Sequence, residues 1–233
     1  MKVSIILPAY NEAKRIEKAV KVVKEYLKRS NYDYEIIIAE DGSTDGTDKI
    51  AERLAKSNSR IIHLHSNERL GRGKALTNAI RQAKGDIVAY LDVDLSTDMK
   101  HLKELIDAIA RGYDVATGSR LMRGSKTERP FKRDLASRIY NLLVRLMLGS
   151  KLRDHQCGFK AFRKSSILPL LDKIKDNYWF WDTELLVLAQ KFDLKVKEIP
   201  VKWKQSEDTK VRFAKDVSYM FSQILRMFSQ NKK

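Results

Sequence analysis

The stretch Gly85-Asp86-Ile87-Val88-Ala89-Tyr90-Leu91-Asp92-Val93-Asp94-Leu95-Ser96 decides the fold, because it joins a short apolar run to two carboxylates. The run from Ile87 to Leu91 follows a Gly-Asp turn signal and is typical of a buried parallel strand. Asp92 and Asp94 come directly after it, where ligands bind in open α/β sheets. Paired hard oxygen ligands suit Mg²⁺ or Mn²⁺ held against a phosphate-bearing substrate. Alternatively, the two aspartates only cap the next helix, although Ser96 or Asp98 would suffice for that.

Composition sets limits on the class of protein. The chain has 233 residues, of which 43% are hydrophobic, enough for one large α/β domain or two small ones. A single cysteine, Cys157, excludes an internal disulfide framework and fits a reducing compartment. Four scattered histidines do not suggest a zinc site. No apolar run approaches the roughly 18 residues of a membrane span, so we expect the chain not to cross a bilayer by itself.

The formal net charge of +16 requires an anionic partner. Nucleic acid, an anionic membrane surface and phosphorylated substrates would each satisfy it. The excess lies mainly in the second half, where residues 120–164 contain only three acidic residues, Glu128, Asp134 and Asp154. The standard nucleic-acid-binding motifs are missing from the sequence, so we do not expect nucleic acid as a partner.

Residues 1–117 alternate strand and helix patterns. We expect strands at residues 2–7, 34–39, 60–65, 86–91 and 114–117. Helical patterns cover residues 12–29, a segment ending near 56, and residues 73–83 and 99–111. This order predicts an α/β fold with a mostly parallel central sheet and helices on both faces. The alternation of strands and helices ends there, and residues 118–132 are expected to form an irregular loop.

Two later segments have apolar residues at helical spacing. The first covers residues 135–148, with Leu135, Ile139, Leu142, Leu143 and Leu146. The second is the C-terminal stretch, with Phe213, Val217, Met220, Phe221, Ile224, Leu225 and Phe228 between basic flanks. Such a pattern is typical of amphipathic helices that lie in a membrane interface. The alternative is that they are ordinary helices packed on the domain.

Polar clusters follow each of the first four expected strands. They are residues 8–12 (PAYNE), 40–43 (EDGS), 67–74 (NERLGRGK) and the Asp92–Asp94 pair. A carboxylate in the second cluster can accept hydrogen bonds from a base or a ribose. The third pairs glycines with cations, among them Lys74, at a helix start, which suits phosphate. The order along one sheet edge predicts a site for base and ribose, then phosphates, then metal.

These motifs allow a resemblance to be stated. PAYNE (8–12), EDGSTDGT (40–47), GRGKA (71–75), DVD (92–94) and GSR (118–120) resemble the nucleotide-sugar half of glycosyltransferase family 2. DHQCGFK (154–160), WDTELL (181–186) and EIPVKW (198–203) are similar to the dolichyl-phosphate hexosyltransferases, above all the glucosyl enzymes, with the mannosyl enzymes close behind. The resemblance implies a GT-A fold and metal-dependent, inverting transfer of a hexose from UDP-glucose or GDP-mannose to dolichyl or polyprenyl phosphate. The expected parts are a nucleotide-sugar half (1–117), an acceptor half of the same catalytic domain (118–207) and a C-terminal amphipathic helix (208–233).

The resemblance also implies site residues by position. The nucleoside is expected at Pro8, Tyr10, Glu12 and Asp41, the metal and diphosphate at Asp92 and Asp94, and further phosphate contacts at Lys74 and Lys210. The acceptor phosphate or sugar is expected at Arg120, Arg133, Ser137 and Gln156. Asp94, Arg120 and Arg133 would carry catalysis. Ser96 stands where mannosyl enzymes commonly have Gln, which leaves the third metal contact open and argues against a mannosyl assignment.

The acceptor determines which further chemistry is needed. A phosphate monoester is largely dianionic at neutral pH and needs no strong base, whereas arginines suit the task of bringing two anions together. Glu184 is the candidate base if the acceptor is a hydroxyl, and otherwise a residue that orders the acceptor pocket. Rival interpretations are a family 2 enzyme with a hydroxyl acceptor and a nucleotidyltransferase. We expect a peripheral enzyme on the cytoplasmic face of a membrane, attached through its amphipathic helices.

Overall fold

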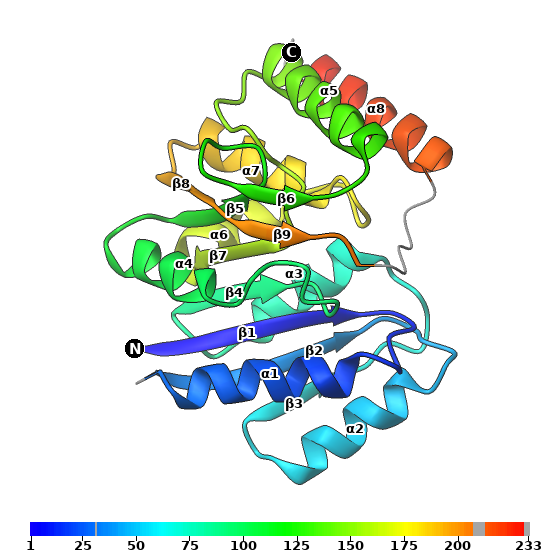
Figure 1. The fold of residues 1–233 in the computed structure, drawn as a ribbon, viewed down its shortest axis with the longest axis vertical. Helices are drawn as coiled ribbons and strands as arrows, with labels where there is room; N and C mark the ends of the chain where they lie inside the picture. Colours follow the sequence, from blue (N-terminus) through cyan, green and yellow to red (C-terminus); the bar gives the residue numbers. More distant parts are fainter. Residues whose placement is uncertain (31, 207–212, 231–233) are drawn as a thin grey trace.

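The computed structural model describes residues 1–30, 32–206 and 213–230. In these ranges the chain builds a seven-stranded sheet in the order β3-β2-β1-β4-β7-β5-β8 (Figure 1). Its strands are β1 (Lys2–Ala9), β2 (Asp33–Glu40), β3 (Ile61–Leu64), β4 (Ile87–Leu91), β5 (Val115–Ser119), β7 (Phe159–Arg163) and β8 (Val196–Pro200). The helices are α1 (Ile16–Lys28), α2 (Thr47–Ser57), α3 (Arg72–Gln82), α4 (His101–Ala110), α5 (Phe131–Leu148), α6 (Lys164–Leu171), α7 (Trp181–Lys191) and α8 (Phe213–Gln230).

The sheet is mostly parallel, as predicted. Strand β7 is the exception, because it lies antiparallel between β4 and β5. Strand β5 comes from the first half of the chain, yet its two neighbours in the sheet, β7 and β8, come from the second half. The two halves of the chain therefore share one sheet.

Apolar side chains along the central strands point alternately to the two faces of the sheet, where they pack into two hydrophobic cores. On one face Ile5 and Leu7 pack with residues of α1 and α4. On the other face Ile6 packs with residues of α3, α6 and α7, including the fully buried Trp181. Helices therefore cover both faces, which confirms the predicted α/β fold class.

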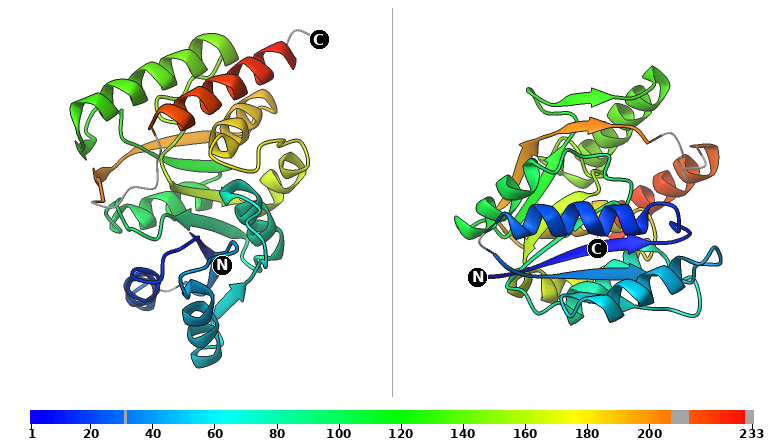
Figure 2. Two further views of the ribbon diagram at one scale, coloured as in Figure 1. Left: turned by 90° about the vertical axis from the view of Figure 1, so that its right-hand side faces the viewer. Right: turned by 60° about the horizontal axis from the view of Figure 1, so that its bottom comes forward.

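Helices α5 and α8 lie side by side over α7 (Figures 1 and 2). Between them is a third apolar cluster, formed by Val144, Leu148, Phe180, Val187, Met220, Ile224 and Met227. The opposite sides of both helices expose large apolar residues, namely Phe131, Leu135, Ile139, Leu142, Leu146, Val217, Phe221 and Leu225. The C-terminal helix is thus packed on the domain along one side and uncovered along the other. No described helix combines the length and apolar character that spanning a bilayer requires.

Two details of the predicted secondary structure were wrong, one helix start and one loop. Helix α1 begins at Ile16 rather than at residue 12, and the N–H groups of Asn11, Glu12 and Ala13 donate to side chains of residues 43–47. The segment 118–132 is not wholly irregular, since β6 (Lys126–Glu128) pairs in parallel with β9 (Lys202–Lys204). A three-residue strand carries too little pattern to be recognised in the sequence.

A buried hydrogen-bond chain supports the start of the sheet and gives the first prediction. The Ser4 hydroxyl donates to Glu35 at 2.7 Å and accepts from the Gly85 N–H at 2.8 Å. Ser4→Ala should lower the free energy of unfolding by about 1–3 kcal/mol, because it leaves a buried N–H without an acceptor. Urea unfolding measures this. The exposed Ser222, whose hydroxyl donates within α8, is the control, and equal losses for Ser4→Ala and Ser222→Ala would contradict the prediction.

Candidate active site

The loops after β1 and β2 are joined to each other by hydrogen bonds. The Asn11 N–H donates to the Ser43 hydroxyl at 3.0 Å, and the Thr44 N–H donates to the Asn11 side chain at 2.8 Å. The Glu12 N–H donates to the Thr47 hydroxyl at 2.8 Å. The segment that contains Pro8, Tyr10 and Glu12 is therefore fixed against the EDGSTDGT loop, as the expected nucleoside site requires.

Asp41 extends this framework to the loop after β3. Its buried carboxylate accepts the N–H groups of Leu70 at 2.7 Å and Gly71 at 2.9 Å. The guanidinium of Arg69 lies 3.9 Å from the centroid of the Tyr10 ring, a cation–π contact. Gly42 lets the loops after β2 and β3 approach closely, because a Cβ at residue 42 would lie 2.6 Å from the backbone nitrogen of Arg69. Asp41 thus holds the loop that carries Arg69.

Asp92 and Asp94 lie directly after β4 and line a small pocket with Ser96 and Gly158. The Ser96 N–H donates to the Asp94 carboxylate at 3.0 Å. A Cβ on Gly158 would lie 1.9 Å from a carboxylate oxygen of Asp92, so only glycine fits there. The Ser96 hydroxyl oxygen is buried and has no hydrogen-bond partner among the described residues. Two carboxylates and an unsatisfied hydroxyl fit the oxygen ligand set of Mg²⁺ or Mn²⁺.

Arg72 connects this pair to the second half of the chain. Its guanidinium donates to Asp92 at 2.8 Å and to Asp182 at 2.7 Å. The ammonium of Lys160 lies 2.9 Å from the other oxygen of Asp182, and the Tyr90 hydroxyl donates to that oxygen too. Burial raises the pKa of Asp182, but the charges of Lys160 and Arg72 outweigh it and hold the pKa below its ordinary value. Asp182 is therefore a buried carboxylate held in its charged form.

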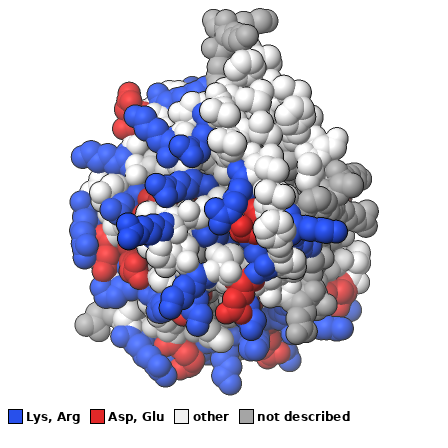
Figure 3. All heavy atoms as spheres, turned by 45° about the horizontal axis from the view of Figure 1, so that its top comes forward, with Lys and Arg blue, Asp and Glu red and all other residues white. Residues whose placement is uncertain are grey.

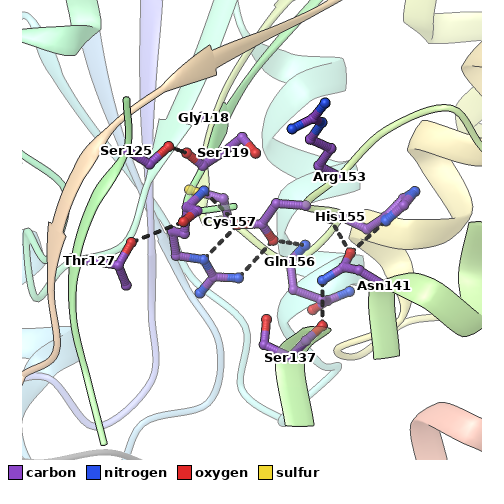
Figure 4. Close-up of polar contacts among 12 residues, drawn as sticks. Gly118, Ser119, Ser125, Thr127, Ser137, Asn141, Arg153, His155, Gln156 and Cys157 are labelled. Atoms are coloured by element: carbon purple, nitrogen blue, oxygen red, sulfur yellow. Dashed lines mark hydrogen bonds and ion pairs between the residues drawn. The ribbon is translucent and has the colours of Figure 1, made fainter. Parts of the chain in front are cut away.

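The segment 153–157, beside the expected acceptor residues, faces Ser137 and Asn141 of α5 (Figure 4). Arg120 and Asp154 make a bidentate pair there, with nitrogen–oxygen distances of 2.7 and 2.8 Å. Burial opposes the charge on Asp154, yet Arg120 lowers the pKa of this carboxyl well below its usual range. The Gln156 amide donates to the Thr183 hydroxyl at 2.8 Å. The structure therefore brings Arg120, Ser137 and Gln156 into one region.

The remaining predicted residues lie in different settings. Glu184 is buried, and one of its oxygens accepts from the Asp176 N–H at 2.9 Å and from Arg226 at 3.0 Å. Arg133 is half-buried in the first turn of α5, and Lys74 is exposed in the first turn of α3. Lys210 lies outside the described residues.

Four residues of the site were not singled out from the sequence: Arg72, Tyr90, Lys160 and Asp182. Arg72 and Asp182 belong to motifs that the sequence does reveal, each two positions before a residue that was chosen. Lys160 carried a signal of its own, because a lysine between apolar residues of a strand is fully buried only when it is paired.

Sequence comparison gives related proteins for the whole chain. The family model described as "Glycosyl transferase family 2" matches residues 4–170 of the chain. Over 99% of its length the chain is 52% identical to "Glycosyltransferase AglD" of Haloferax volcanii, of which it spans only 37%. It is 32% identical to "Dolichyl-phosphate beta-glucosyltransferase ALG5D" of Trichomonas vaginalis, covering 91% of this chain and 68% of that protein.

Solved structures share the fold. Mannosyl-3-phosphoglycerate synthase from Rubrobacter xylanophilus superposes with a TM-score of 0.72 at 16% identity, over 99% of this chain and 74% of that one. Glucosyl-3-phosphoglycerate synthase from Mycobacterium tuberculosis, in complex with Mn²⁺, UDP and glucosyl-3-phosphoglycerate, superposes with a TM-score of 0.64 at 19% identity. The match covers 97% of this chain and 78% of that one.

The buried charge network predicts a large cost when one partner is removed. Asp182→Asn should lower the free energy of unfolding by about 3–5 kcal/mol, because it leaves Lys160 charged and uncompensated in the interior. Asp172→Asn removes the aspartate of the exposed pair with Arg81 (2.6 Å) and should cost about 1 kcal/mol or less. Denaturant unfolding of both variants decides this, and similar losses would contradict a buried charge network.

Proposed function

The chain belongs to glycosyltransferase family 2, and we propose that it transfers a hexose from a nucleotide sugar to dolichyl or another polyprenyl phosphate, with inversion. The observation that carries the proposal is the similarity to a dolichyl-phosphate β-glucosyltransferase over 91% of the chain. That similarity, and Ser96 at the position where mannosyl enzymes commonly have Gln, favour UDP-glucose over GDP-mannose as donor.

Asp92 and Asp94, with the Ser96 hydroxyl as a third contact, would hold Mg²⁺ or Mn²⁺. The bound cation would neutralise the charge that develops on the leaving diphosphate. The presence of Mn²⁺ beside UDP in the glucosyl-3-phosphoglycerate synthase complex supports this assignment. Gly158 keeps the space beside Asp92 free of a side chain, and Arg72 orients its carboxylate.

The loops after β1, β2 and β3 would bind the nucleotide. Tyr10 offers a ring face for the base, while Pro8, Glu12 and Asp41 complete the nucleoside pocket. Arg69 already stacks on Tyr10, so a cation lies beside the expected base position. Lys74, in the first turn of α3, would lie near the phosphates, as would Lys210, whose position is not described.

Arg120 and Arg133 would bring the acceptor phosphate to the donor, with Ser137 and Gln156 lining the acceptor site. Asp154 occupies two nitrogens of Arg120 and so fixes the plane of its guanidinium. The surroundings of Glu184 favour a phosphate acceptor over a hydroxyl acceptor. Its carboxylate is buried among backbone N–H groups and Arg226, which suits an ordering role and not that of a base.

The outer side of α5 and α8 would place the enzyme on the cytoplasmic face of a membrane. Leu142 and Leu146 on α5 are 50% and 73% exposed, and Phe221 on α8 is 44% exposed. Lysine and arginine side chains crowd one side of the face in Figure 3, next to a band of uncharged surface. Apolar residues beside cations suit an interface with anionic lipid. A lipid acceptor requires the enzyme to work at that interface.

The metal assignment gives a prediction for catalysis. Asp94→Asn should lower hexose transfer at least about a hundredfold, because a bound cation contributes several kcal/mol of charge stabilisation. Asp94 is exposed, so the fold should persist. The measurement is transfer of radiolabel from UDP-glucose and from GDP-mannose to dolichyl phosphate in detergent, with and without Mn²⁺.

Asp98→Asn is the matched control, since Asp98 instead accepts the N–H of Lys100 at 3.1 Å. Near-normal turnover of Asp94→Asn would refute the metal assignment. If neither donor labels the lipid fraction but nucleoside diphosphate is released when other acceptors are added, the chain is a glycosyltransferase whose acceptor is not a lipid phosphate. Release of inorganic diphosphate would indicate a nucleotidyltransferase.

The exposed apolar side of α5 predicts binding to lipid. The double variant Leu142→Ser with Leu146→Ser should bind vesicles containing anionic lipid about tenfold more weakly, since burying the exposed parts of two leucines contributes about 1.5–3 kcal/mol in total. Vesicle co-sedimentation measures this. Phe192→Ser, which removes an exposed apolar residue at the end of α7, should bind like the wild type. Equal binding by all three proteins, or none by the wild type, would contradict the proposal.

A further inference from the structure

Glu40, His63 and His65 form a cluster of oxygen and nitrogen donors at the ends of β2 and β3. One donor atom from each residue lies within 4.8 Å of the donor atoms of the other two. Strands β2 and β3 pair in parallel, which brings Glu40 beside the two histidines. The imidazole centroids are 5.7 Å apart. The cluster belongs to none of the contacts assigned above to nucleotide, metal or acceptor.

His63 has an unsatisfied nitrogen. Its Nε2 is buried and has no hydrogen-bond partner in the described part of the chain. It lies 3.9 Å from the nearest Glu40 oxygen, too far for a hydrogen bond but within reach of a shared ion. A neutral imidazole nitrogen is the commonest metal ligand in proteins. A buried nitrogen without a partner requires an explanation, and a ligand is one.

The other two residues have the outer contacts that metal ligands need. One oxygen of Glu40 accepts the Ser43 N–H at 2.5 Å, and the other lies 2.5 Å from Nδ1 of His65. The remaining ring nitrogen of His65 lies 3.0 Å from the Asn67 side-chain oxygen. Metal-bound histidines characteristically donate their second N–H to such an oxygen, which fixes the ring. Glu40 is fully buried, and its contacts with Ser43 and His65 pair both carboxylate oxygens.

We propose that Glu40, His63 and His65 bind a divalent transition metal of the Zn²⁺ class. Two imidazoles and one carboxylate form a known ligand set for Zn²⁺, with water in the fourth position. On binding, the proton between His65 Nδ1 and the Glu40 oxygen would leave to solvent, and these atoms, now 2.5 Å apart, would separate to about 3.3 Å to admit the metal. The site is separate from Asp92 and Asp94, because strand β1 lies between β2 and β4.

The metal would brace the nucleotide loops and take no part in the reaction. Glu40 directly precedes Asp41, which holds the N–H groups of Leu70 and Gly71. His65 directly precedes the segment that runs to those amides. An ion that joins Glu40 to His65 therefore ties the start of the loop after β2 to the start of the loop after β3.

The test is calorimetric titration of the full chain with ZnCl₂, after removal of metals by a chelator and without nucleotide. An Asp94→Asn background weakens the other divalent site. We expect saturable binding of one Zn²⁺ per chain, weakened at least about tenfold by His65→Asn and also by His63→Asn. His65 is 43% exposed, so that variant should fold. His101→Asn, a histidine bound to Glu104 and to the Lys202 N–H, should leave binding unchanged.

A spectroscopic readout separates ligation from a general effect on stability. Co²⁺ in place of Zn²⁺ should give visible absorption bands that His65→Asn abolishes and His101→Asn preserves. Absence of saturable Zn²⁺ binding in the Asp94→Asn protein, the parent of the histidine variants, would overturn the proposal. Equal affinity of the parent and His65→Asn would overturn it as well.

Discussion

The contact on which the site depends is the double ion pair of Arg72, which reaches Asp92 with one nitrogen and Asp182 with another. Asp182 and Lys160 are buried and Arg72 nearly so, and buried charges are costly unless they are paired. Lys160 completes the network from β7. The four residues come from α3, from the loop after β4, from β7 and from α7. Charge pairing therefore joins the first and second halves of the chain.

The antiparallel strand β7 is what makes this network possible. It enters the sheet beside β4, so that the Asp92 N–H donates to the carbonyl of Gly158 at 3.1 Å. The same register directs Lys160 toward Tyr90, 3.2 Å away. A parallel strand at this place would bring its other end to Asp92. The reversal of one strand thus explains why a motif near residue 158 lies against a motif near residue 92.

Most of the fold could be predicted from the sequence because apolar runs and turn signals recur regularly up to residue 117. The site residues were harder to predict, because the sequence does not show which side of a helix faces a given partner. Residues two apart in a helix point about 200° apart, so only one of them can face a given partner. The motifs pointed to Lys74 and Glu184, whereas the ion pair that joins α3 to α7 is formed by Arg72 and Asp182. The histidines seemed scattered along the chain, but pairing of β2 with β3 gathers two of them at Glu40.

Phase also explains how the outer helices can connect to the site. Asp182 faces Arg72, while Glu184, on the other side of α7, accepts from Arg226 of α8 at 3.0 Å. One short helix therefore contacts the ion-pair network of Arg72 on one side and helix α8 on the other. Under the proposed function, a lipid phosphate that arrives at the surface of α5 and α8 would have to reach the donor from there. Because Arg226 donates to the buried carboxylate of Glu184, a shift of α8 would disturb α7 two residues from Asp182.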